Sequence, residues 1–63
     1  MYMNLTKLPI GKQIQIKRVI VEMTQTELAK ELGIHRTTLS TIEKGTTELP
    51  EKLYEDVEKF LNS

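Results

Sequence analysis

Residues 23–45 read MTQTELAKELGIHRTTLSTIEKG. The pattern of this stretch predicts two short helices joined by a tight turn. Thr24 and Glu27 have the spacing of a capping box, in which each side chain accepts a hydrogen bond from the backbone amide of the other residue. Met23 and Leu28 have the spacing of the hydrophobic staple that often flanks such a box. The first helix is therefore expected to begin directly after Thr24.

Two glycines mark the predicted ends of these helices. Gly33 and Gly45 stand where a helix commonly ends in a left-handed residue, a conformation that glycine adopts at little cost. The small Ala29 in the apolar face of the first helix lets the second helix cross it closely. Residues 24–44 therefore predict a helix-turn-helix.

The second helix of the pair, residues 36–44, has two unlike faces. Leu39 and Ile42 are three residues apart and predict a buried face. The helix has a single acid, Glu43, so that little on it repels phosphate. Its polar side consists of Arg36, Thr37, Ser40, Thr41 and Lys44. A cation alone is usually an ordinary solvated charge, but so many threonines, which are mediocre helix formers, favour contact with DNA bases.

This segment resembles the helix-turn-helix of the Cro/C1-type phage repressors and the related Xre-like bacterial regulators, over about residues 10–61. The family pattern is an apolar-Thr/Ser-Gln-x-Glu-Leu-Ala run, a glycine turn and a Glu-x-Gly exit. Here these elements stand at 23–29, 33–34 and 43–45. The resemblance implies an all-α fold, a small lambda-repressor-like bundle of four helices. Domain 10–61, with its motif at 24–44, would follow an N-terminal arm or edge strand at 1–9.

The resemblance also implies which residues contact double-stranded DNA. Arg36 is the strongest of these predictions, because a guanidinium binds guanine O6 and N7 with two parallel hydrogen bonds. The other base-reading residues in the major groove would be Thr37 and Thr41, with His35 and Ser40 beside them. The phosphate backbone would be bound by Gln25, Thr24, Lys44 and Thr46.

Two further features concern structure. Family members often hold an arginine of the helix before the motif against a glutamate near the end of the second motif helix, and Arg18 and Glu43 stand at those positions. Arg18 is therefore expected in an ion pair and not on DNA. His35 occupies the predicted N-cap of the second helix, where the family usually has Ser or Thr, and imidazole caps a helix less well than a hydroxyl.

The helix before the motif, about residues 10–22, carries more apolar surface than one helix face needs. Its expected core residues are Ile10, Ile14 and Val21. In addition it carries an apolar stripe of Ile16, Val19 and Ile20.

Residues 1–8, MYMNLTKL, show partial alternation of apolar and polar residues. Two interpretations stay open. In the first, Tyr2, Met3 and Leu5 fold down over Ile16 and Ile20 and cap the core. In the second, Tyr2 and the apolar stripe form a dimer or partner surface.

The charge is unevenly distributed along the chain. The net charge of the 63 residues is zero, but residues 1–47 hold seven Lys or Arg against four Glu, and residues 48–63 hold two Lys against five acids. The basic part contains the motif. A last helix, 50–61, is acidic and is expected to face away from DNA. Its apolar side consists of Leu53, Val57, Phe60 and Leu61, with Tyr54 at the margin.

Several classes of function have no support in the sequence. There is no cysteine, one histidine and no nucleophile elbow or phosphate loop, so neither an enzyme nor a metal or other cofactor is expected. No signal peptide and no apolar run of about 20 residues is present, which predicts a cytoplasmic protein of a bacterium or phage. A core of this size is marginal, so self-association would help stability.

Two functions remain open. The favoured one is a sequence-specific transcriptional regulator that binds a palindromic operator as a homodimer. The alternative is an interaction module on the same fold, which would bind a protein partner such as an antirepressor or adaptor through the apolar stripe. The basic, hydroxyl-rich helix 36–44 favours DNA.

Overall fold

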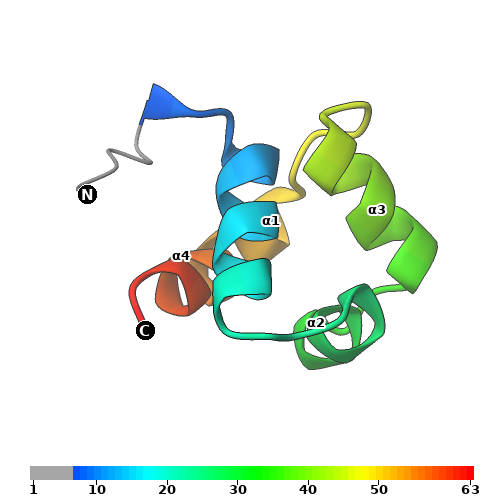
Figure 1. Ribbon diagram of the computed structural model, residues 1–63. Coiled ribbons are helices and arrows are strands. Elements are labelled where there is room, and N and C mark those ends of the chain that lie inside the picture. Colours follow the sequence, from blue (N-terminus) through cyan, green and yellow to red (C-terminus); the bar gives the residue numbers. More distant parts are fainter. Residues whose placement is uncertain (1–6) are drawn as a thin grey trace.

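The computed structural model describes residues 7–63, and this part of the chain folds into four α-helices without a strand. The helices are α1 (Ile10–Ile20), α2 (Gln25–Leu32), α3 (Arg36–Lys44) and α4 (Tyr54–Leu61), with a short 3-10 helix, η2 (Glu51–Leu53), before α4 (Figure 1). The predicted all-α, four-helix fold is confirmed. The predictions for Tyr2, Met3 and Leu5 lie outside the described residues.

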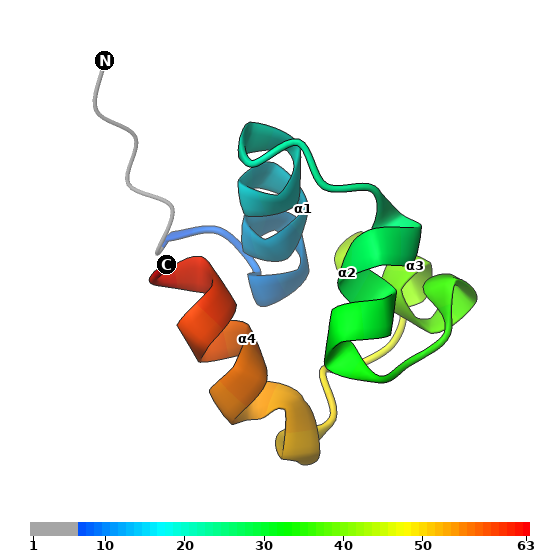
Figure 2. The same ribbon diagram turned by 90° about the horizontal axis from the view of Figure 1, so that it is seen from below.

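The helices enclose one small core. α1 packs against α3 and α4, and α2 packs against α3. Figure 2 shows α4 alongside α1, with α2 and α3 on the other side. Every helix contributes to the core, whose buried apolar residues are Ile14, Leu28, Ala29, Leu32, Leu39, Ile42, Leu53 and Val57.

The predicted glycine ends of α2 and α3 are confirmed. Gly33 and Gly45 have φ angles of 73° and 82°, in the left-handed region. The residue after each glycine donates its amide to a carbonyl five residues back, from Ile34 to Ala29 and from Thr46 to Thr41, both at 3.0 Å. This is the Schellman arrangement, which satisfies carbonyls that the helix leaves without partners.

The end of α1 has the same arrangement without a glycine. The Met23 amide donates to the Arg18 carbonyl at 2.9 Å and the Glu22 amide to the Val19 carbonyl at 3.0 Å. Glu22 takes the left-handed position with a φ of 59°. This turn ends the helix at Ile20, earlier than the expected residue 22.

Two of the expected core residues of α1 are exposed instead. Val21 is 42% exposed because it lies beyond the last helical residue. Ile10 is 40% exposed because it is the first residue of the helix, at the rim of an open groove between α1 and α4. Ile14, in the middle of α1, is fully buried as expected.

Gly11 sets the distance between α1 and α3. It is buried in the first turn of α1, directly against the last carbonyls of α3. A Cβ atom at this position would overlap the carbonyl oxygen of Ile42 and come within 3.0 Å of that of Glu43. Both atoms belong to the backbone, so α1 crosses α3 this closely only with a glycine.

The last helix begins later than expected. Instead of one helix over 50–61, η2 follows Pro50 and α4 starts at Tyr54. Leu53 and Val57 are buried, and Phe60 and Leu61 pack partly buried against the core. Tyr54 is 56% exposed, at the margin of the helix.

Candidate nucleic-acid interface

The capping box at the start of α2 is confirmed. The Thr24 hydroxyl accepts from the Glu27 amide at 3.1 Å, and the Glu27 carboxylate accepts from the Thr24 amide at 2.8 Å. The hydrogen bond that the Thr24 backbone amide donates to the Glu27 carboxylate lowers the pKa of Glu27, and hydrogen bonding with the Thr24 side chain lowers it further. The start of α2 is thus fixed by local bonds, and Met23 packs against the core beside it.

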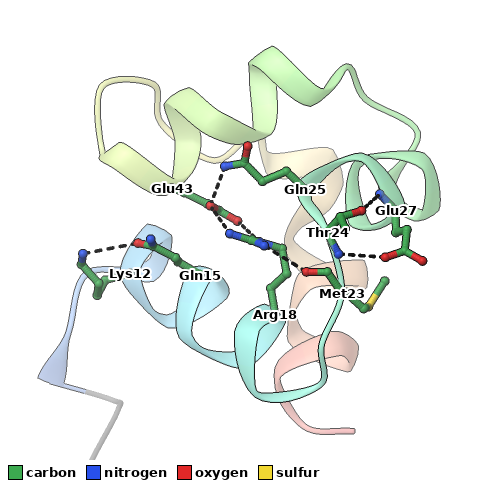
Figure 3. A network of polar contacts seen from close by, with 8 residues as sticks. All are labelled: Lys12, Gln15, Arg18, Met23, Thr24, Gln25, Glu27 and Glu43. Carbon is green, nitrogen blue, oxygen red and sulfur yellow. Dashed lines mark hydrogen bonds and ion pairs between the residues drawn. The ribbon is translucent and has the colours of Figure 1, made fainter.

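A buried carboxylate connects three of the helices. Glu43 of α3 accepts from the Arg18 Nε at 2.9 Å, from the Arg18 Nη2 at 3.2 Å and from the Gln25 Nε2 at 2.9 Å (Figure 3). Arg18 also donates from Nη1 to the Met23 carbonyl at 2.9 Å. Glu43 on α3 therefore binds the end of α1 and the first residue of α2, and Arg18 links this cluster to the loop after α1.

This cluster is sheltered from water. The side chains of Arg18 and Glu43 are 13% and 3% exposed. A charge at such a site needs a partner, and here each charge has one together with further hydrogen bonds. The structure thus brings the two residues of the expected ion pair together, and their charges offset each other inside the protein.

The polar face of α3 lies on the side opposite its buried residues Leu39 and Ile42. We give this name to Arg36, Thr37, Ser40, Thr41 and Lys44. Arg36, Thr37 and Lys44 are exposed, and Ser40 and Thr41 are half-buried. A helix that presents cations and short hydroxyl side chains in this way has the dimensions that the major groove of DNA admits.

His35 stands exposed at the N-cap of α3. Its side chain makes no capping hydrogen bond. The imidazole therefore does not cap the start of α3 as a hydroxyl would, and it lies next to Arg36 in the chain.

Some of the predicted DNA-contacting hydroxyls have partners within the protein. Thr41 donates to the Thr38 carbonyl at 2.9 Å, and Thr46 donates to the Thr41 carbonyl at 3.1 Å. Their oxygens remain able to accept, and a threonine methyl can contact thymine. Thr41 is therefore better suited to accept a hydrogen bond or to pack against a base than to donate.

Gln25 begins α2 and also contacts α3, and the sequence alone does not indicate that contact. It is the first residue of α2, where helix amides and the helix dipole favour a phosphate. Its side-chain amide also donates to Glu43. The expected contact residue at the start of α2 is thus fixed relative to α3.

The apolar stripe of α1 lies away from the polar face of α3. By helical periodicity Ile20 is on the side of α1 opposite Gly11, which touches α3. Val19 and Ile20 are 61% and 66% exposed, whereas Ile16 is half-buried. The stripe and the polar face are therefore separate surfaces.

Three residues beside the polar face, Gly11, Lys12 and Gln15, were not predicted from the sequence. Gly11 has no local turn that would have marked it, because its role depends on α3. Lys12 and Gln15 of α1 line a groove with Ser40 and Lys44 of α3. For Lys12 and Gln15 the only signal was their spacing of three residues, which places both on one side of a helix.

Neither a metal site nor a membrane helix is present in residues 7–63. No three His, Cys, Asp or Glu side chains of this part gather as metal ligands. None of its helices has both the length and the apolar character needed to cross a bilayer.

Comparison with known proteins agrees with the geometry. No solved structure matches the chain significantly. A family model described as helix-turn-helix matches residues 14–63, from the middle of α1 to the last residue. The match covers most of the chain and contains α2, α3 and α4. The chain therefore belongs to the Cro/C1-type, Xre-like family of helix-turn-helix DNA-binding regulators.

Proposed function

We propose that this protein is a sequence-specific transcriptional regulator whose helix α3 reads the major groove of an operator. The observation that carries the proposal is the exposed polar face of α3, which has two cations and has no exposed acid. Its one acid, Glu43, is buried and paired with Arg18. The DNA-binding domain would be residues 10–61, without catalytic activity.

Arg36 is the proposed principal base reader. It is exposed at the amino end of α3, the end that enters the groove in this motif. A guanidinium paired with guanine O6 and N7 contributes about 1–3 kcal/mol of discrimination between bases. Thr37 and Thr41 would contact neighbouring bases, with His35 and Ser40 beside them.

The proposed backbone contacts lie at the start of α2 and beyond the carboxyl end of α3, two places that are close together because Gln25 and Lys44 line one groove. Thr24 and Gln25 would bind a phosphate at the start of α2, where the amides of the first turn add to the attraction. Lys44 and Thr46 would bind the backbone at the carboxyl end of α3 and just beyond it. Contacts of this kind set the register of the protein on the duplex and carry no sequence information by themselves.

We also propose that the protein binds DNA as a homodimer. A single short helix reaches few base pairs, and dimers of this motif bind two half-sites about 34–36 Å apart. The operator would then be palindromic, because the symmetry of the site follows that of the dimer. Its place of action would be the cytoplasm of a bacterium or of the bacterial host of a phage.

A second candidate function is the binding of a protein partner through the apolar stripe. Val19 and Ile20, together with Val21, form an exposed apolar surface beyond what a monomer of this size needs. Ile20→Asp separates the possibilities. Loss of self-association in sedimentation equilibrium would assign the stripe to the homodimer, and an unchanged oligomeric state would favour a different protein.

Titration with a short duplex of random sequence, followed by amide NMR shifts, tests the DNA-binding surface. The largest shifts are expected at the start of α2 and along α3, with small shifts in α4, whose first turn is acidic. Shifts confined to α4 or to the apolar stripe would contradict the proposed surface. Absence of any binding at low salt would contradict DNA binding itself, since non-specific affinity is general for such proteins.

A further inference from the structure

A polar groove lies between α1 and α3, beside the proposed DNA surface. We call it the α1–α3 groove. Residues of α1, of α3 and of the start of α2 line it. Its lining residues are Pro9, Gly11, Lys12, Gln15, Gln25, Ser40, Glu43, Lys44 and Gly45.

The charges around this groove favour an anion. Lys12 of α1 and Lys44 of α3 both line it, and both are exposed. The one carboxylate in its lining, Glu43, is 3% exposed and is paired with Arg18. The first turn of α1 contains no acid. The groove therefore presents two positive charges that no exposed carboxylate of its lining offsets.

Lys12 is held in place by its own helix. Its Nζ donates to the Gln15 Oε1 at 3.3 Å, one turn further along α1 (Figure 3). The ammonium has three hydrogens, so the bond to Gln15 leaves others for a ligand. Gln15 thus directs the ammonium along the side of α1 that lines the groove.

The position of the groove indicates which anion it would bind. Gln25, Ser40 and Lys44, which line it, are all proposed DNA-contacting residues. A sugar-phosphate strand that follows the start of α2 along α3 would therefore pass over this groove. Its phosphates are the anions that such a surface meets first.

We propose that Lys12, positioned by Gln15, binds a backbone phosphate of the operator, so that α1 extends the DNA-binding surface beyond the helix-turn-helix. The inference rests on the proposed DNA-binding function. It assigns a role in affinity and none in sequence discrimination, because a phosphate is the same at every base pair.

The test is the salt dependence of binding to a duplex of random sequence, for the wild type and Lys12→Gln. Each phosphate contact by a lysine contributes about 0.9 to the slope of log K against log salt. Lys12→Gln is expected to lower the slope by about that amount and to weaken binding to every duplex by the same factor. Lys12→Arg, which keeps the charge, is expected to retain the wild-type slope.

Lys52→Gln is the matched control. Lys52 is also an exposed lysine, lies in η2 and does not line the groove. This variant removes the same charge from the chain, so a general effect of net charge would change both variants alike. A slope unchanged by Lys52→Gln and reduced by Lys12→Gln supports the proposal.

Two results would overturn it, and they are distinguishable. A steep wild-type slope that Lys12→Gln leaves unchanged would reject the α1 contact while leaving the DNA-binding function in place. A wild type that binds no duplex at low salt would reject both. Ethylation interference gives an independent check, because ethylation of the contacted phosphate should weaken the wild type and leave Lys12→Gln unaffected.

Discussion

The Arg18 Nε lies 2.9 Å from the Glu43 Oε2, and this ion pair holds α1 against α3 at the place where Gln25 of α2 also binds Glu43. The three helices meet at one buried carboxylate. Because α3 carries the proposed base readers and α2 a proposed phosphate contact, the orientation of the whole surface depends on this cluster. An arginine that looks like a DNA contact by charge is thus used for structure.

Arg18→Met is expected to be strongly destabilising. It removes the partner of a carboxylate that is 3% exposed, and an uncompensated buried charge costs about 3–5 kcal/mol. Urea unfolding followed by circular dichroism measures the change in the free energy of unfolding. The double variant Arg18→Met/Glu43→Leu should recover much of the loss, because it leaves no unpaired charge. If the double variant loses as much stability as the two single variants together, burial of an unpaired charge is not the cause.

Gly11→Ala is expected to destabilise the protein, although alanine is the better helix residue. The added methyl meets the Ile42 backbone carbonyl, which no side-chain movement can displace. Overpacking of this kind costs about 1–3 kcal/mol and exceeds the 0.5–1 kcal/mol that alanine gains in a helix. Thermal unfolding measures the balance, with Lys12→Ala as the control at the next, exposed position. Equal or raised stability of Gly11→Ala would show that α1 does not cross α3 this closely.

Glu22→Gly is expected to stabilise the protein. Glu22 has a φ of 59°, a left-handed conformation that costs a residue with a Cβ about 1–2 kcal/mol and glycine little. Glycine is more flexible in the unfolded chain, which offsets part of this stabilisation. A net gain of about 0.5–1 kcal/mol in the free energy of unfolding is expected. Glu31→Gly, at an exposed position inside α2, should instead lose stability. The same sign for both variants in urea unfolding would contradict the left-handed turn at Glu22.

The helix ends and Gly11 differ in how far along the chain their contacts reach. Both ends of α2 and the end of α3 depend on hydrogen bonds between residues a few positions apart, so residue types and spacing were sufficient to predict them. The residues concerned are Thr24, Glu27, Gly33 and Gly45. Gly11 acts through α3, more than thirty residues away in the chain. Nothing near it in the sequence marks the contact.

In the candidate site, too, some features follow from the local sequence and others depend on how the helices pack. The polar face of α3 follows from helical periodicity and was predicted together with its buried side. The bond from Gln25 to Glu43 and the groove that Lys12 shares with Lys44 depend on how the helices pack. The end of α1 was predicted too late because Glu22, and not a glycine, takes the left-handed position there.

Acid should destabilise the protein partly through Glu27. Its hydrogen bond from the Thr24 amide lowers its pKa in the folded state below the ordinary value of 4.5. The stabilisation is therefore fully present above that value and is lost as the pH falls through the lowered pKa. Glu27→Gln keeps an acceptor for the box and cannot titrate. Its thermal midpoint should fall less than that of the wild type between neutral and strongly acidic pH, and an identical fall would reject this role.

Arg36→Ala and Lys44→Ala should weaken DNA binding in different ways. Arg36→Ala is expected to lose about 1–3 kcal/mol on the preferred operator and much less on unrelated duplexes. Lys44→Ala should weaken binding to all duplexes alike and lower the salt slope by about one. Fluorescence anisotropy with both kinds of duplex at several salt concentrations separates the two patterns. Equal losses on all sequences for Arg36→Ala would remove it from the base readers.

Selection of bound duplexes from a random library, at a fixed salt concentration near the physiological value, tests sequence-specific operator binding most directly. We expect enrichment of a two-fold symmetric sequence whose half-sites are centred about one helical turn apart, roughly 34–36 Å. Each half-site should contain a guanine whose preference disappears when the selection is repeated with Arg36→Ala. A folded protein that enriches no sequence would contradict sequence-specific operator binding and would favour protein binding through the apolar stripe of α1.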